Sequence, residues 1–190
     1  MNRRVLQAAQ FNSTLVAVSG VSWVAFWFLN AWLFAATHFA PGISLIYVPA
    51  GIRLIILLLF GVWGAIGIAL TDPILFWTEF DQQPVLEVAV NAVISGFVPL
   101  AGIRILQRAS GMDTDLKRLK PLHLPALALT VSILAPLALT AQFFVCGLRP
   151  ASDLLSGFFA MTLGDFLGCL LALLLAKIAI FYFRAWIPSG

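Results

Sequence analysis

The stretch from residue 47 to residue 73, YVPAGIRLIILLLFGVWGAIGIALTDP, constrains the fold more than any other part of the sequence. It is apolar almost throughout, which is typical of a chain that crosses a lipid bilayer. An arginine, Arg53, and an aspartate, Asp72, nevertheless stand inside it. Because a membrane interior is where a charge is hardest to keep, these two residues require partners.

The composition extends this interpretation to the whole chain. Of the 190 residues, 62% are hydrophobic and 10% are charged, and the mean hydropathy is +1.02. These values lie far outside the range of soluble globular proteins. Because one crossing takes roughly 20 to 25 residues, most of the chain is needed for about six transmembrane helices. We therefore expect an all-α polytopic membrane helical bundle, a single integral membrane domain over residues 1–190.

The apolar segments place the expected spans at about 15–37, 44–60, 61–78, 85–106, 124–145 and 154–183. Only the Gly-Val-Trp-Gly segment at 61–64 separates the second span from the third, which predicts a tight helical hairpin. A turn over 38–42 and an acidic loop over 79–84 precede the second and fourth spans.

Basic residues collect on one side of such a six-span bundle and fix its orientation. They are Arg3, Arg4, Arg104, Arg108, Lys117, Arg118, Lys120 and Arg184. The opposite side receives Glu79, Asp81, Asp153 and a single arginine, Arg149. The positive-inside rule then predicts two cytoplasmic termini, and we expect a multi-pass protein of the bacterial inner (cytoplasmic) membrane. The same rule accounts for the net charge of +3 better than a nucleic-acid partner, which we do not expect.

Polar side chains from four of the expected helices lie at similar depth, in the outer half of the membrane. They are Arg53, Asp72, Glu87, Asn91 and Asp165. An uncompensated charge costs about 2.5 to 3.5 kcal/mol on insertion scales, so we expect these groups to meet. Arg53 would pair with Asp72 or with Asp165, because guanidinium and carboxylate form two-pronged hydrogen bonds. The surplus acid would be protonated, hydrated in a cavity open to the outside, or matched by a cationic or hydrogen-bonding ligand.

Each of these residues also has a purely structural interpretation. Arg53 and one aspartate would form a buried pair that fixes helix register. Glu87 would favour the amino-terminal end of the fourth span through the helix dipole, and Asn91 would join neighbouring helices by hydrogen bonds. Neither histidine nor cysteine residues show metal-ligand spacing, so we expect no metal and no cofactor.

The segment TLGDFLGCLLALLLAKI carries two glycines four residues apart, on either side of Asp165. This spacing predicts close helix packing, and it would bring the Asp165 carboxylate to a point where it could meet Arg53 directly. The residues for which we expect a packing role are Pro49, Gly51, Gly61, Gly64, Gly164 and Gly168.

The segments YVPAGIRLIILLLFGVWGAIGIAL, NAVISGFVPLAGIRIL and MTLGDFLGCLLALLL resemble, in this order, the first-type membrane-associated sensor (MASE) domain of bacterial histidine kinases and diguanylate cyclases. That family has a proline-small-glycine start to a helix, a glycine-punctuated hairpin and a Gly-Asp-x-x-Gly segment. The matching positions are Pro49, Gly51, Gly164, Asp165 and Gly168. The chain departs from the family in having fewer spans and in lacking the tryptophan usually found shortly before the Gly-Asp.

This resemblance implies perception of a signal. Because no kinase or cyclase module follows Arg184, it also implies output through a membrane or cytoplasmic signalling protein in trans. We expect Arg53 to anchor an acidic group, either of Asp165 or of a small-molecule ligand that displaces it. Occupancy would then reposition the sixth span.

The chain is also similar, in size, span count and outward polar groups, to the substrate-binding S subunit of energy-coupling-factor vitamin transporters. That resemblance implies capture of a small molecule for transport. It calls for a docking face of small residues on the first span, where Ser19, Gly20 and Ser22 are the candidates. An enzyme is not expected, since the sequence has no Gly-x-Ser-x-Gly elbow, no His-Glu-x-x-His pair and no plausible catalytic dyad.

Overall fold

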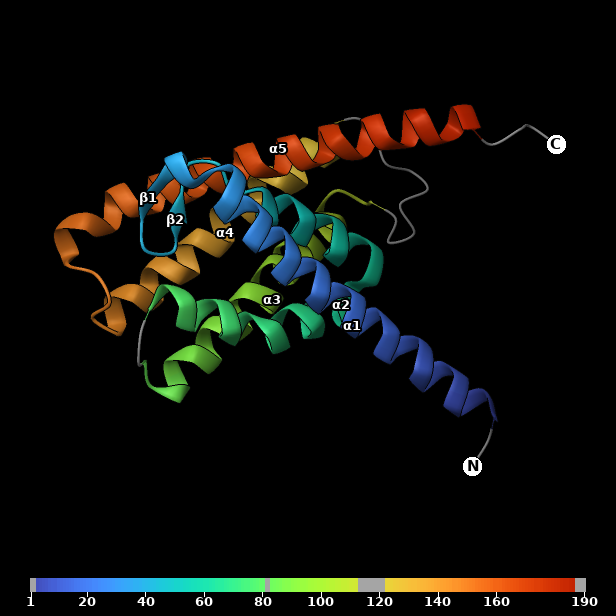
Figure 1. The fold of residues 1–190 in the computed structure, drawn as a ribbon, viewed down its shortest axis with the longest axis horizontal. Coiled ribbons are helices and arrows are strands. Elements are labelled where there is room, and N and C mark those ends of the chain that lie inside the picture. The colour runs from blue at the N-terminus through green and yellow to red at the C-terminus, as the bar shows by residue number, and fades with distance from the viewer. Residues whose placement is uncertain (1–2, 81–82, 113–121, 187–190) are drawn as a thin grey trace.

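A computed structural model describes residues 3–80, 83–112 and 122–186, without the side chains of 3–6 and 183–186. Its elements are α1 (Arg3–Leu33), the 3-10 turn η1 (Ala35–Thr37), β1 (His38–Ala40), β2 (Ile43–Ser44), α2 (Val48–Glu79), α3 (Val85–Ala109), α4 (His123–Val145), the 3-10 turn η2 (Ala151–Asp153) and α5 (Leu154–Trp186). Within the described ranges, five helices are long and apolar enough to cross a membrane. The prediction of a helical, multi-pass membrane protein is confirmed at this level (Figure 1).

The second and third predicted spans form one element, α2, with a break at its middle. Gly61 has φ 56° and ψ −125°, whereas the residues on both sides are helical. A side chain at Gly64 would meet the carbonyl oxygen of Ile56 at 3.0 Å, although eight residues of straight helix separate two positions by about 12 Å. The first arm of α2 (48–60) and the second arm (62–79) therefore fold back on each other, and Figure 1 shows the chain reversing at this point.

The sequence-based count of six separate spans is not confirmed, for a geometric reason. At about 1.5 Å per residue, the first arm of α2 is about 20 Å long, which is shorter than a hydrocarbon core of about 30 Å. Residues 44–47, which we expected to begin this span, instead lie in β2 and the connection that follows it. The reversal at Gly61 also explains why the start of α1 and the end of α5 point to the same end of the molecule in Figure 1.

The connection from α1 to α2 is a small antiparallel hairpin of β1 and β2. It turns at Gly42, whose φ of 72° favours glycine. α2 then begins at Val48, and Pro49 occupies the first turn, where a missing N–H costs nothing. The Val48 N–H donates to Oδ1 of Asn30 on α1, at 2.9 Å. α1 thus supplies the cap that the first turn of α2 lacks locally.

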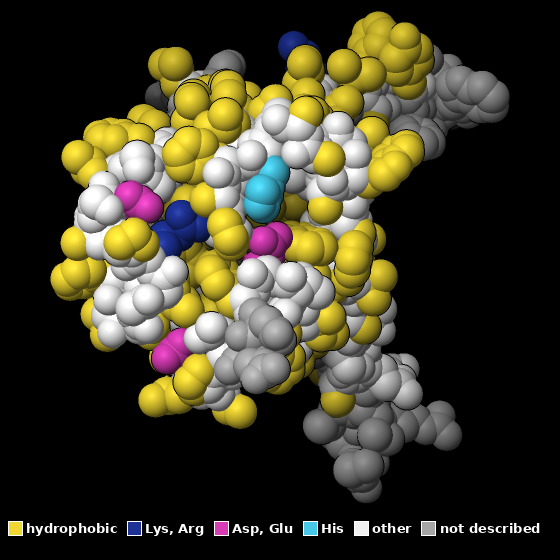
Figure 2. Space-filling model, turned by 60° about the vertical axis from the view of Figure 1, so that its left-hand side comes forward, with side chains coloured by type: hydrophobic (Ala, Val, Ile, Leu, Met, Phe, Trp, Pro, Cys, Tyr) yellow, Lys and Arg dark blue, Asp and Glu magenta, His cyan; other side chains and the backbone are white. Residues whose placement is uncertain are grey.

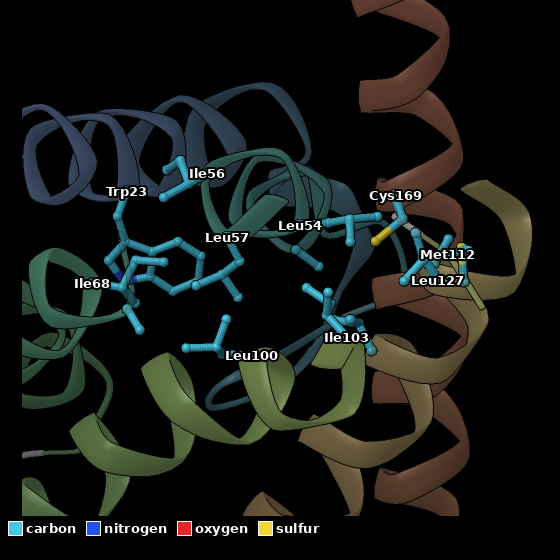
Figure 3. Close-up of a cluster of buried hydrophobic side chains, with 14 of the residues drawn as sticks. Trp23, Leu54, Ile56, Leu57, Ile68, Leu100, Ile103, Met112, Leu127 and Cys169 are labelled. Atoms are coloured by element: carbon cyan, nitrogen blue, oxygen red, sulfur yellow. The ribbon is translucent and has the colours of Figure 1, made fainter. Parts of the chain in front are cut away.

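The helices pack in chain order, α1 on α2, α2 on α3, α3 on α4 and α4 on α5, and the contact of α5 with α2 closes the bundle. One core of buried side chains joins these elements (Figure 3). Trp23, Leu57 and Ile68 lie together at one end of it, and Leu127 and Cys169 lie near α5 at the other. Cys169 forms no disulfide bond and is buried among these side chains.

Glycines allow α5 to approach the start of α2 closely. A side chain at Gly164 would collide with the backbone of Ser44, and one at Gly168 with the backbone of Tyr47. Across the same contact, a Cβ at Gly51 would lie 2.8 Å from the Cα of Cys169. The Tyr47 N–H donates to the carbonyl oxygen of Gly164 at 3.1 Å. The Gly-Asp-x-x-Gly segment therefore lies against the backbone of residues 44–48, at β2 and the connection that leads into α2.

Candidate functional site

A buried ion pair joins the first arm of α2 to α5. Nη2 of Arg53 lies 2.9 Å from Oδ2 of Asp165, and the two side chains are 3% and 9% exposed. The close approach allowed by Gly164 and Gly168 brings the aspartate within reach of the arginine. Of the two pairings that the sequence left open, the structure contains this one.

Asp72 belongs to a second network, on the second arm of α2. Its Oδ1 accepts a hydrogen bond from Nε1 of Trp23 at 3.2 Å, and its Oδ2 accepts one from Nδ2 of Asn91 at 2.5 Å. The donors come from α1 and α3. Hydrogen bonds from neutral donors stabilise an ionised carboxylate without a counter-ion. In the described part of the chain Asp72 has no salt bridge.

Trp23 connects the two networks. Its indole N–H donates to Asp72, and the guanidinium carbon of Arg53 lies 5.5 Å from the centre of its ring. A cation at this distance is attracted by the electron-rich face of the indole. The one signal of this role in the sequence is general: a buried tryptophan usually needs a hydrogen-bond acceptor. Asn30 and Tyr47 are also part of the site and also went unassigned.

A cavity of about 430 Å³ borders these networks and is lined by residues of all five helices and of the β-hairpin. Its polar base contains Arg53, Asp72, Asn91 and Asp165, and it extends toward His38 and Glu79. The aromatic residues of its walls are Trp23, Trp27, Phe34, Tyr47, Phe76, Phe80 and Phe143. In Figure 2, charged side chains and a histidine gather around a recess with hydrophobic walls.

The tip of the β-hairpin is held beside this cavity from two directions. The Gly42 N–H donates to Oε2 of Glu79, at the end of α2, at 2.9 Å. Nη2 of Arg149, beyond α4, donates to the carbonyl oxygen of Pro41, and its guanidinium carbon lies 5.5 Å from the ring centre of Phe143. Burial lowers the pKa of Arg149 below its ordinary value, and Asp153 opposes that change.

Glu87, which we expected in the polar cluster, is not among the described residues that line the cavity. It lies in the first turn of α3, the position favoured by the helix dipole. Its backbone carbonyl accepts a hydrogen bond from Nε2 of Gln142 at 2.8 Å, while its buried Oε2 has no hydrogen-bond partner among the described residues. Asn91, one turn further along α3, points to Asp72 instead.

Metal binding finds no support in the residues that the structure describes, since no three histidine, cysteine, aspartate or glutamate side chains are grouped to hold an ion. The site is therefore defined by charge, hydrogen bonds and aromatic surface. The cavity volume of about 430 Å³ lies within the range of roughly 300 to 1,000 Å³ that is typical of small-molecule pockets.

The fold and the site together define a class, a multi-pass helical membrane protein with a polar cavity inside its bundle. Comparisons with protein-family models, with curated proteins and with solved structures give no match to this chain.

Proposed function

We propose that this protein is a membrane-embedded sensory module that binds a small molecule in the cavity and passes the resulting movement of α5 to a partner protein. The observation that carries the proposal is the buried pair of Arg53 and Asp165 at the base of the cavity. Within the described residues, it is the one salt bridge that ties α5 to the rest of the bundle.

Ligand binding would act through this pair. A ligand can shift a protein between two arrangements only if it binds one of them better than the other. A molecule that interacts with Arg53, Asp165 or their neighbours changes the stability of the pair, and with it the preferred position of α5 against the start of α2. α5 has 33 residues, or a length of about 50 Å, against a hydrocarbon core of about 30 Å. Its far end would thus extend beyond the membrane toward a partner.

In this proposal the protein lies in the bacterial inner membrane with both termini cytoplasmic. The first arm of α2, although shorter than the hydrocarbon core, then makes one pass together with the residues before it, and the second arm makes another. Arg104 and Arg108 at the end of α3 support this orientation, as does Arg149 as a single arginine on the other side. Of the other residues behind the orientation, Asp81, Lys117, Arg118 and Lys120 lie outside the described residues. Arg3, Arg4 and Arg184 lie within them, but their side chains are not described. The likeness to the MASE sensor domain remains part of the proposal.

One observation favours sensing over transport. Ser19 is fully buried, and a side chain at Gly20 would meet the Gly67 carbonyl oxygen at 3.0 Å. These small residues of α1 are used within the chain, against α2. They do not form the free docking face that a transporter's capture subunit would present to its energy-coupling module.

The proposal is tested by purifying the intact protein in mild detergent and identifying both the proteins and the small molecules that remain bound. A histidine kinase or diguanylate cyclase partner supports sensing, and an ATPase module would support transport instead. Bound small molecules should be lost from Arg53→Ala and Asp165→Asn and retained by Glu87→Gln, which alters a carboxylate outside the cavity. If the first two variants fold, retain the same molecules and signal normally, the proposed function is wrong.

A further inference from the structure

The charges that line the cavity are unequal. Of the described lining residues, Asp72, Glu79 and Asp165 are carboxylates, and Arg53 is the one guanidinium. The pair with Arg53 neutralises Asp165. Asp72 and Glu79 accept hydrogen bonds from neutral groups, the Trp23 indole, the Asn91 amide and the Gly42 N–H. The carboxylates that line the cavity thus outnumber its guanidinium, and negative charge in surroundings of low polarity concentrates cations.

The aromatic walls of the cavity also favour a cation. Two aromatic rings of the cavity already lie beside a cation of the protein. The guanidinium carbon of Arg53 is 5.5 Å from the ring centre of Trp23, and that of Arg149 is 5.5 Å from the ring centre of Phe143. Trp27, Tyr47 and Phe76 line the same space, and no cation of the described residues lies over their faces. Aromatic surfaces near a carboxylate form the usual receptor for ammonium groups, since the ring faces attract the cation without hydrating it.

We propose that the cavity binds an organic cation, an amine or quaternary ammonium compound with an apolar portion, whose nitrogen lies near Asp72 and the aromatic walls. This inference rests on the proposed function and names the chemical class of its ligand. A volume of about 430 Å³ suits a small organic molecule.

An anionic ligand is disfavoured by the state of Arg53. Its Nη2 donates to Oδ2 of Asp165 at 2.9 Å, so a ligand anion would have to compete with this carboxylate for the guanidinium. A ligand carboxylate that took over Arg53 would leave Asp165 buried without its counter-ion. Leaving one member of a buried pair uncompensated is strongly unfavourable.

The test compares molecules of equal shape and different charge. Choline and its neutral carbon analogue 3,3-dimethylbutan-1-ol are the matched pair, benzyltrimethylammonium is a second cation, and benzoate is the anion. Binding to the intact protein in detergent is measured by titration calorimetry and by the shift in thermal unfolding. We expect both cations to bind, and choline to bind at least about tenfold more tightly than its neutral analogue.

Substitutions show which carboxylate of the cavity interacts with the ligand cation. Asp72→Asn should weaken binding of the cations at least about tenfold, because the amide keeps an acceptor for Trp23 while Asn91 can turn its own amide. Glu87→Gln is the matched control and should bind as the unaltered protein does. If Asp72→Asn does not fold, Glu79→Gln replaces it, since its amide oxygen can still accept the Gly42 N–H.

The inference is overturned if choline binds no better than the neutral alcohol, if benzoate binds better than either cation, if neither cation binds, or if the folded variant at Asp72 or Glu79 binds cations as before. Binding of benzoate or the neutral alcohol that is lost in Arg53→Ala would show a ligand cavity of another chemical class. In that case the proposed function stands and only the ligand class is wrong.

Discussion

Arg53 and Asp165, 112 positions apart in the chain, meet at 2.9 Å inside the bundle and join α2 to α5. Both side chains are more than nine-tenths buried. Removing water from two charges is costly, and the pair is therefore more informative about helix arrangement than about net stability. The contacts that hold α2, α5 and their neighbours in this arrangement can be tested one at a time.

Removing one member of this ion pair should destabilise the protein more than replacing both members by apolar side chains. Asp165→Asn or Arg53→Met alone should lower the free energy of unfolding by about 3 to 5 kcal/mol, because each leaves a buried group without its partner. The double variant Arg53→Met/Asp165→Leu should lose less than the sum of the two single changes. Unfolding in mixed micelles of mild detergent and sodium dodecyl sulfate measures these values. Additive losses would show that the two side chains do not interact.

The indole N–H of Trp23 should matter separately from its ring. Trp23→Phe retains an aromatic face near Arg53 but removes the donor to Asp72. Leaving this buried carboxylate oxygen unsatisfied should cost about 1 to 3 kcal/mol of unfolding free energy. Trp27→Phe is the control, since Trp27 lines the same cavity and its contact with Phe28 is between rings. Equal losses in the two variants would contradict a specific role for the Trp23 hydrogen bond.

A methyl group at Gly168 should separate α5 from α2. The Cβ of Gly168→Ala would collide with the backbone of Tyr47, which cannot move aside without displacing the start of α2. Overpacking of this kind costs about 1 to 3 kcal/mol. In Gly157→Ala, on the same helix, the new Cβ meets Cδ1 of Ile43 at 3.2 Å, the end of a side chain and not backbone, so a smaller change is expected. Thermal unfolding of the two variants side by side checks this, and a stable Gly168→Ala would show that the contact is looser than described.

The reversal of α2 should depend on Gly61. Its φ of 56° and ψ of −125° lie where side chains are rarely accommodated, and Gly61→Ala should cost about 1 to 3 kcal/mol of unfolding free energy. Val62→Ala, at the half-exposed neighbouring position, should change stability much less. The same micelle unfolding measurement applies. Unchanged stability in Gly61→Ala would indicate that the turn is made by another residue.

Particular residues show how far sequence reasoning reached. Each helical residue advances about 1.5 Å, so a position along each helix could be estimated from the sequence, and Arg53, Asp72, Asn91 and Asp165 all line one cavity. The same reasoning placed Glu87 with them, although it lies outside the cavity. Position along a helix says nothing of the direction in which a side chain points once the helix has packed.

The sequence by itself determined that this chain forms apolar helices, that its few buried charges must find partners, and that glycines mark the places where backbones meet. Only the tertiary structure decided that Arg53 pairs with Asp165, that Trp23 and Asn91 satisfy Asp72, and that an aromatic-walled cavity remains above them. The physical reason is rotation about the helix axes. Hydropathy is the same for every rotation of a segment, whereas the choice of partner depends on the packing of all five helices at once.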